Sequence, residues 1–171
     1  MIKIGKVFFA AALATVLFAT LVESQSAEAQ EFRLGGHVGA LGLTGEGASA
    51  STIAYGVNAL INPFDIAAFQ LDATFGRIGG GQYFSTSPAI VIFLANYSEF
   101  RMGFLGGPGF YKIPGLSTKF GLHIGVMGEF NLSEHIFVGM ESRYHPVFGD
   151  GAPNVWNVFV TAGFRFENGG W

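Results

Sequence analysis

The sequence predicts an all-β fold, an eight-stranded antiparallel up-and-down transmembrane β-barrel. Three observations lead to this prediction: long segments in which apolar and polar residues alternate, a composition poor in charge, and connections that alternate between compact turns and longer loops. Half of the 171 residues are hydrophobic, 15% are aromatic and only 12% are charged. Soluble domains carry about 25% charged residues, so this composition favours an exterior that faces lipid.

The start of the chain has the pattern of a secretory signal peptide. Two lysines precede an apolar stretch at 7–22, and Ala27-Glu28-Ala29 supplies the small residues of a cleavage site. We therefore expect residues 1–29 to be a signal peptide and residues 30–171 to form the barrel domain. The competing interpretation is a retained membrane helix, but the apolar run is shorter than the roughly 20 residues that span a bilayer.

The first half of the barrel domain predicts four strands. The third shows the alternation clearly, with an apolar face from Ala67 to Phe75 opposite Gln70, Asp72 and Thr74. The fourth is apolar on both faces, which leaves its orientation open, and Pro88 is expected at its end because proline cannot donate to the ladder. The four predicted strands cover 31–43, 52–62, 66–77 and 87–96.

The second half predicts four more strands, and the last three alternate. In the final strand, the face from Trp156 to Phe166 is apolar, and the opposite face carries Asn157, Thr161 and Arg165. Most of the eight strands reach ten or more residues. A tilted membrane strand needs about 9–11 residues, whereas soluble strands average about 5–6. The strands of this half cover 99–112, 117–132, 136–148 and 154–167.

The predicted connections differ between the two ends of the barrel. Compact turns are expected at one end, and longer loops rich in glycine at the other, which is the pattern of periplasmic turns and external loops. The turns lie at 62–65, 96–98 and 132–135, and the loops at 44–51, 78–84 and 148–153.

Charged residues indicate which face is outside. We find no Asp, Glu, Lys or Arg on the apolar face of any strand whose faces can be assigned. A lipid-facing Arg or Lys at the bilayer midplane costs about 2–4 kcal/mol. An eight-stranded barrel holds little more than side chains, so we predict a packed polar core in which Arg101 faces Glu129. The predicted core residues are Arg33, Asp72, Arg101, Lys119, Glu129, Glu141, Arg143 and Arg165.

Three histidines, His37, His123 and His145, are expected to point inward, with His123 beside His145. A metal site or proton-responsive gate is the alternative to simple packing, but no carboxylate spacing supports it, and the chain has no cysteine. We expect no metal and no cofactor. Aromatic residues near strand ends predict interfacial girdles: Phe32, Tyr55, Phe64, Tyr97, Phe100, Tyr111, Phe120, Tyr144 and Trp156.

Three segments carry a family resemblance. They are the alternating Val160, Ala162, Phe164 and Phe166, the stretch Gly106-Gly-Pro-Gly-Phe-Tyr111, and Arg143-Tyr-His-Pro-Val147. Residues 30–171 resemble the small outer-membrane β-barrel proteins of the outer membrane protein A, X and W type. The resemblance implies export to the periplasm and insertion into the outer membrane, with outer-membrane lipids, periplasmic chaperones and the barrel-assembly machinery as partners. It also implies that the final strand carries the assembly signal, ending on Phe166 or on Trp171.

The leading functional interpretation is a monomeric barrel with a structural role in the envelope and short surface loops. The alternatives are a narrow channel or lateral passage for small hydrophobic compounds, a lipid A-modifying enzyme, an adhesin, and a soluble periplasmic ligand-binding barrel with its faces reversed. Enzymatic function is not expected. The one cluster that suggests it is Ser142, Tyr144 and His145, and there the serine and the histidine fall on opposite faces of one strand. A net charge of -3 gives no footprint for nucleic acid.

Overall fold

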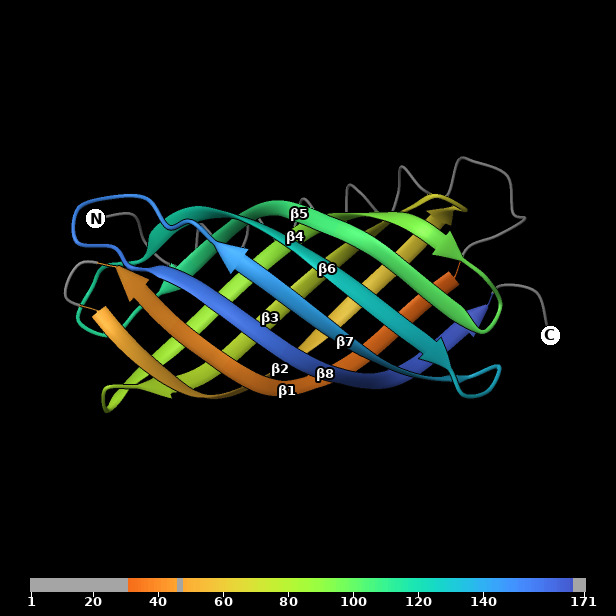
Figure 1. Ribbon diagram of the computed structural model, residues 1–171, viewed down its shortest axis with the longest axis horizontal. Coiled ribbons are helices and arrows are strands. Elements are labelled where there is room, and N and C mark those ends of the chain that lie inside the picture. The colour runs from red at the N-terminus through yellow and green to blue at the C-terminus, as the bar shows by residue number, and fades with distance from the viewer. Residues whose placement is uncertain (1–30, 46–47, 168–171) are drawn as a thin grey trace.

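The computed structural model describes residues 31–45 and 48–167, which form a closed barrel of eight antiparallel strands (Figure 1). The predicted fold class is therefore confirmed. The expected signal peptide, residues 1–29, lies outside the described residues and stays a prediction. The strands are β1 Glu31–Gly45, β2 Ala48–Phe64, β3 Ala67–Ile78, β4 Gly81–Asn96, β5 Phe100–Lys112, β6 Lys119–Asn131, β7 Ile136–His145 and β8 Asn154–Glu167.

Strand order follows the chain, and the pairing of β8 with β1 closes the wall. Glu31 is in register with Glu167, so β1 begins where β8 ends (Figure 1). We call this the inner end of the barrel, and the end where β1 meets the start of β2 the outer end. Closure pairs the two edge strands with each other. This matters because backbone N–H and C=O groups left free at an edge would find no hydrogen-bond partner in hydrocarbon. Within the described residues, no helix has the length and apolar character needed to cross a membrane.

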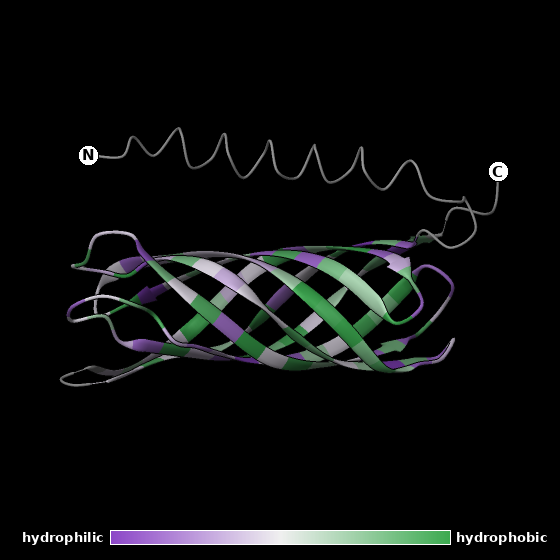
Figure 2. Cartoon of the chain, turned by 90° about the horizontal axis from the view of Figure 1, so that it is seen from above, coloured by the Kyte–Doolittle hydropathy of each residue, from purple (hydrophilic) through white to green (hydrophobic). Residues whose placement is uncertain are grey.

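The wall has two chemically different faces. Hydrophobic and hydrophilic residues alternate along the strands (Figure 2). On β1, Leu34 and Val38 are exposed on the outside, whereas Arg33 and His37 are buried inside. The predicted faces of the third, sixth, seventh and eighth strands have the same sense in the structure. This arrangement reverses that of a soluble protein, because the outer surface is apolar and most of the charged strand residues are buried inside.

Register resolves the orientation of β4. Phe69 pairs with Ile90, so Ile90 faces outward with Phe69 while Val91 is fully buried. Pro88 does not lie at the strand end as expected, because β4 begins at Gly81. It sits in the middle of the strand, and the β4–β5 ladder skips from Thr86↔Phe110 to Ile90↔Gly106 around it. That register places Pro88 opposite Pro108, and neither proline has a backbone N–H to donate.

Two predicted outer loops are much shorter than expected. Within the segment 78–84, only Gly79 and Gly80 form the turn, with φ values of 57° and 82°, and β4 begins at Gly81. Positive φ at both central residues suits a two-residue hairpin, and only glycine adopts it without strain. Strands β1 and β2 likewise extend through most of 44–51. The remaining outer connections, 113–118 and 146–153, are longer, and β7 ends at His145 rather than at 148.

Candidate functional site

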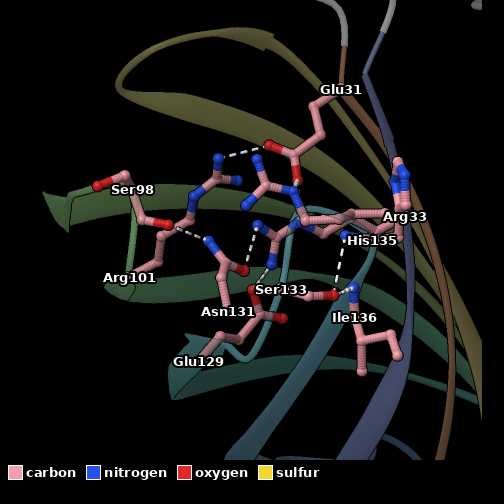
Figure 3. Close-up of polar contacts among 10 residues, drawn as sticks. Glu31, Arg33, Ser98, Arg101, Glu129, Asn131, Ser133, His135 and Ile136 are labelled. Carbon is pink, nitrogen blue, oxygen red and sulfur yellow. Dashed lines mark hydrogen bonds and ion pairs between the residues drawn. The ribbon is translucent and has the colours of Figure 1, made fainter.

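The barrel interior contains the predicted polar residues, gathered at two levels. Near the inner end, side chains from β1, β5 and β6 converge on one another (Figure 3), and Arg165 of β8 lies against Glu31. We call this set the inner ionic cluster; it comprises Glu31, Arg33, Arg101, Glu129, Asn131 and Arg165. Each of its five charged side chains is buried.

Arg33 is the centre of the inner ionic cluster. Its guanidinium donates to the carboxylates of both Glu31 and Glu129, and its Nη2 donates to Asn131 Oδ1 at 3.3 Å (Figure 3). Only 1% of Arg33 is exposed, and its Cζ lies 5.1 Å from the ring centroid of Phe137. These contacts supply the hydrogen bonds and opposite charges that a buried guanidinium requires.

Glu31 joins three arginines, and sequence reasoning did not include it in the core. Arg101 donates to Glu31, and Arg165 Nε lies 3.5 Å from Glu31 Oε1. Glu31 stands two residues before Arg33 on the same strand face, so period-two alternation would have placed it inside. Arg101 and Glu129 are in register as expected, yet their ion pairs are with Glu31 and Arg33. The expected facing of Arg101 and Glu129 is confirmed by the register, and their ion pairs form with other residues because long side chains reach across the narrow interior.

A second group of polar side chains lies farther along the interior. We call it the central polar cluster; it comprises His37, Gln70, Asp72, Thr74, Ser87, Glu141 and Arg143. Arg143 pairs with Glu141, and its Nη1 donates to Ser87 Oγ at 3.1 Å. Asp72 Oδ2 lies 3.7 Å from Arg143 Nη2 and 3.4 Å from His37 Nδ1. Thr74 donates to Asp72 Oδ1 at 2.9 Å, and Gln70 donates to Glu141 Oε2 at 3.1 Å. His37 is thus held by polar neighbours inside the wall.

The buried charges balance. Among the residues whose side chains the structure describes, four buried acids, Glu31, Asp72, Glu129 and Glu141, accompany four buried arginines at positions 33, 101, 143 and 165. These eight groups supply equal numbers of opposite charges to one another. This balance favours a packed core over an ion path.

Lys119 differs from the other predicted core residues. It begins β6 at the outer end and is only half-buried. Its Nζ donates to the carbonyl oxygen of Asp150 at 3.4 Å, in an exposed position. Lys119 therefore belongs to the rim of the barrel and contacts neither ionic group.

The other two inward histidines lie side by side above the central polar cluster. The ring centroids of His123 and His145 are 5.6 Å apart. His145 contacts the Tyr111 hydroxyl at 2.8 Å through Nδ1 and Asn157 Nδ2 at 2.9 Å through Nε2. Tyr111 was expected in an outer girdle, but it is fully buried, because it shares the face of Arg101 on β5. Both nitrogens of His145 are engaged, and the described residues contain no group of three or more potential metal ligands.

An apolar cluster closes the interior at the outer end. We call it the outer cap; its buried members are Leu41, Leu43, Ala54, Ile78, Tyr83, Tyr111, Ile113, Val147, Val155 and Phe159. Leu116 and Ala152, from the two longer outer connections, pack against it. Together with the ionic groups below, the outer cap fills the interior with side chains, as expected for eight strands.

The remaining predicted residues lie on the outer surface. Val160, Phe164 and Phe166 are about half exposed on β8, with Ala162 between them, so the expected assembly signal faces outward beside the closing seam. Whether Phe166 or Trp171 ends that signal involves 168–171, which lie outside the described residues. Ser142 and Tyr144 also face outward, whereas His145 is buried, so this cluster does not assemble.

The prediction that the lipid face carries no charge is wrong at the outer rim. Arg77 and Lys112, near or at the ends of β3 and β5, are exposed on the outward face. Arg77 follows Phe75 by two residues and Lys112 follows Phe110 by two, so each cation shares the outward face of its phenylalanine. Both cations lie beyond the apolar belt. The midplane penalty for lipid-facing charge does not apply there.

Comparison with known proteins gives matches in structure only. No family model and no curated protein matches the sequence. Outer membrane protein OprG from Pseudomonas aeruginosa is 14% identical, with a TM-score of 0.57 over 83% of this chain and 97% of its own. Neisserial surface protein A is 14% identical, with a TM-score of 0.58 over 80% and 96%. Ail of Yersinia pestis, the attachment invasion locus protein, is 14% identical, with a TM-score of 0.57 over 81% and 99%. The chain therefore has the fold of the small eight-stranded outer-membrane barrels.

Proposed function

We propose that the protein is an integral outer-membrane barrel with a structural role in the envelope and a closed interior. The observation that carries this proposal is the filling of the interior by balanced ion pairs beneath the outer cap. The apolar outer surface supports membrane insertion, since exposed side chains such as Ile53, Leu94 and Ile124 would be costly in water. Short outer connections leave little surface for an adhesive role.

Fractionation and gel migration test insertion. A closed barrel resists detergent until it is heated, so unheated protein from the outer-membrane fraction should migrate differently from heated protein. A soluble periplasmic protein with no such shift would contradict the proposal and favour the soluble ligand-binding barrel.

Bilayer recordings test closure. Purified barrel in a planar bilayer should give no steady conductance, and a large porin reconstituted in parallel verifies that the assay detects an open pore. Regular single-channel steps from the purified barrel would contradict the closed interior and favour a channel.

One observation favours a second candidate, the lateral passage of small hydrophobic compounds. The β4–β5 ladder is interrupted where Pro88 faces Pro108, and Ala89, Val91 and Leu105 line the interior beside it with apolar side chains. A disulfide between cysteines at positions 86 and 110, which pair across this seam, would hold it shut. Passage through the seam predicts that this disulfide lowers uptake of a lipophilic dye and that reduction restores it. Equal uptake in both redox states would exclude the seam as a route.

A further inference from the structure

In the described part of the barrel, the outward-facing charge lies at one place, the outer end of β3 and β5. Among strand residues whose side chains the structure describes, Arg77 and Lys112 are the two charged ones that face outward. Both are cationic, both are exposed, and both lie at the outer end. Neither forms an ion pair or hydrogen bond within the described part of the chain. Two exposed cations without a partner among the described residues are therefore available to an anionic ligand from outside the protein.

Strand register places the two cations within reach of one ligand. Arg77 pairs with Gln82, and Lys112 pairs with Phe84, so β4 lies between them and the two positions are offset by two residues. Strands lie about 4.8 Å apart and rise about 3.4 Å per residue, which separates the two backbones by roughly 12 Å. Two long flexible side chains span that distance to a single headgroup. Gln82 is exposed on the same face and adds an amide donor.

A row of aromatic rings lies directly beneath the cations. Ring centroids are 6.1 Å apart for Tyr55 and Phe75, and 5.1 Å apart for Phe75 and Phe84. The row continues across β5 and β6, where Phe110 and Phe120 are 5.6 Å apart. Aromatic girdles mark the boundary between hydrocarbon and headgroups. Arg77 and Lys112, each two residues beyond a girdle phenylalanine, therefore lie at headgroup depth.

The inner end has a girdle but no such cations. Phe32 and Phe166 stack there with centroids 6.0 Å apart, and Phe100 and Phe130 are 4.8 Å apart. In the described residues of this end, no lipid-facing lysine or arginine accompanies them, and the turns carry Asp65, Glu99 and Glu134. A general need for interfacial cations would place them at both ends. Their restriction to the outer end indicates recognition of a headgroup in the outer leaflet.

We propose that the outer end of β3, β4 and β5 binds the phosphate-bearing headgroup of an outer-leaflet lipid. Arg77 and Lys112 pair with phosphate oxygens, and the Gln82 amide donates to the same headgroup. The acyl chains pack on Phe75, Phe84 and Phe110 below. This site rests on the proposed membrane insertion, because only an inserted barrel brings its girdle to the lipid boundary.

The test compares lipid binding by native mass spectrometry of the full barrel in a neutral detergent. The probes are lipid A carrying its phosphates and the same lipid with the phosphates removed. The variant is Arg77→Gln with Lys112→Gln, whose side chains have no protein partner to lose. The matched control is Lys119→Gln, which removes a cation from the same end but from the inside of the rim.

We expect the wild type to prefer the phosphorylated lipid. The double variant should lose about thirtyfold in affinity for it, and each single variant about fivefold, since each basic side chain contributes independently near an anionic lipid. Lys119→Gln should bind as the wild type does, and binding of the dephosphorylated lipid should be the same in all variants. Unchanged binding by the double variant, or an equal loss in Lys119→Gln, would overturn the lipid site.

Two further arms separate the remaining outcomes. Displacement of the lipid by inorganic phosphate alone, at similar concentration, would overturn the lipid assignment and leave a free-phosphate site. Heated and unheated gel migration is recorded for every sample, so that insertion is measured separately. A barrel that inserts but does not discriminate between the lipids refutes this site alone, whereas a chain that never inserts refutes the proposed function as well.

Discussion

The two ends of the barrel interior differ in chemistry: at the inner end charged side chains pack beside apolar ones such as Phe93, whereas the outer end is filled by the outer cap. The inner ionic cluster consists of charged groups whose burial requires partners, and Arg33 holds two carboxylates at once. The outer cap consists of aliphatic and aromatic side chains, with Leu41, Tyr111 and Val155 fully buried. Both clusters are buried at their centres, where Arg33 is 1% exposed and Leu41 is fully buried.

This arrangement explains how a narrow barrel can bury charged side chains and remain closed. Ion pairs alone would leave a hydrated path wherever one partner moved. The outer cap excludes water from that end and thereby strengthens the electrostatic interactions beneath it, since the effective dielectric constant falls when water is absent. The two ends should therefore respond differently to substitution, which four variants and their controls can test.

The largest effect is expected for Arg33→Met. The substitution leaves Glu31 and Glu129 without their shared partner, and breaking a buried ion pair costs about 3–5 kcal/mol. Urea unfolding of the barrel in lipid vesicles, followed by tryptophan fluorescence, measures the free energy of unfolding. Lys119→Met is the matched control, since Lys119 lies at the rim of the barrel. This substitution should change the free energy of unfolding by less than about 0.5 kcal/mol.

A paired substitution sharpens the result. Arg33→Met combined with Glu129→Leu removes both charges of one pair, and apolar replacement of a whole buried pair is often neutral. The double variant should therefore unfold at higher urea than Arg33→Met alone. If the losses of unfolding free energy from Arg33→Met and from Glu129→Leu simply added, the destabilisation would come from packing at each position. The electrostatic explanation of the inner end would then be wrong.

Leu41→Ala should lower the free energy of unfolding by about 3 kcal/mol, because truncating a fully buried leucine leaves a cavity. Leu34→Ala on the same strand is the control: Leu34 faces outward and is half exposed, so lipid fills the space that the side chain leaves. The same urea titration compares them. An equal loss for both variants would show that the outer cap is not tightly packed.

Much of this architecture could be predicted from the sequence, because a strand with two different faces reveals them by its period. That period places Glu141 and Arg143 inside and Val138 and Met140 outside, as the structure has them. The period could not orient β4, because both of its faces are apolar. Only the pairing of β4 with β3 shows which face points inward. Tyr111 was assigned to the girdle from its closeness to a strand end, although its even spacing from Arg101 indicates the inner face.

The choice of ion-pair partners lay beyond sequence reasoning. Register correctly sets Arg101 opposite Glu129, but both side chains bond across the interior, to residues that the register does not name. In a barrel this narrow, four arginines compete for four carboxylates at similar reach. The geometry of the whole interior then decides the pairs, and a pattern along one strand cannot.

The smallest effect is expected for Tyr111→Phe, at the boundary between the cap and the polar interior. The substitution keeps the ring in the outer cap but removes the hydroxyl that contacts His145 Nδ1 at 2.8 Å. Loss of one buried hydrogen bond costs about 1 kcal/mol, and Asn157 still contacts the other nitrogen of His145. Tyr55→Phe, at an exposed position on the outer girdle, should leave the urea midpoint unchanged. A loss as large as that of Leu41→Ala would mean that His145 depends on Tyr111 for its position, and that the polar interior and the cap form one cooperative unit.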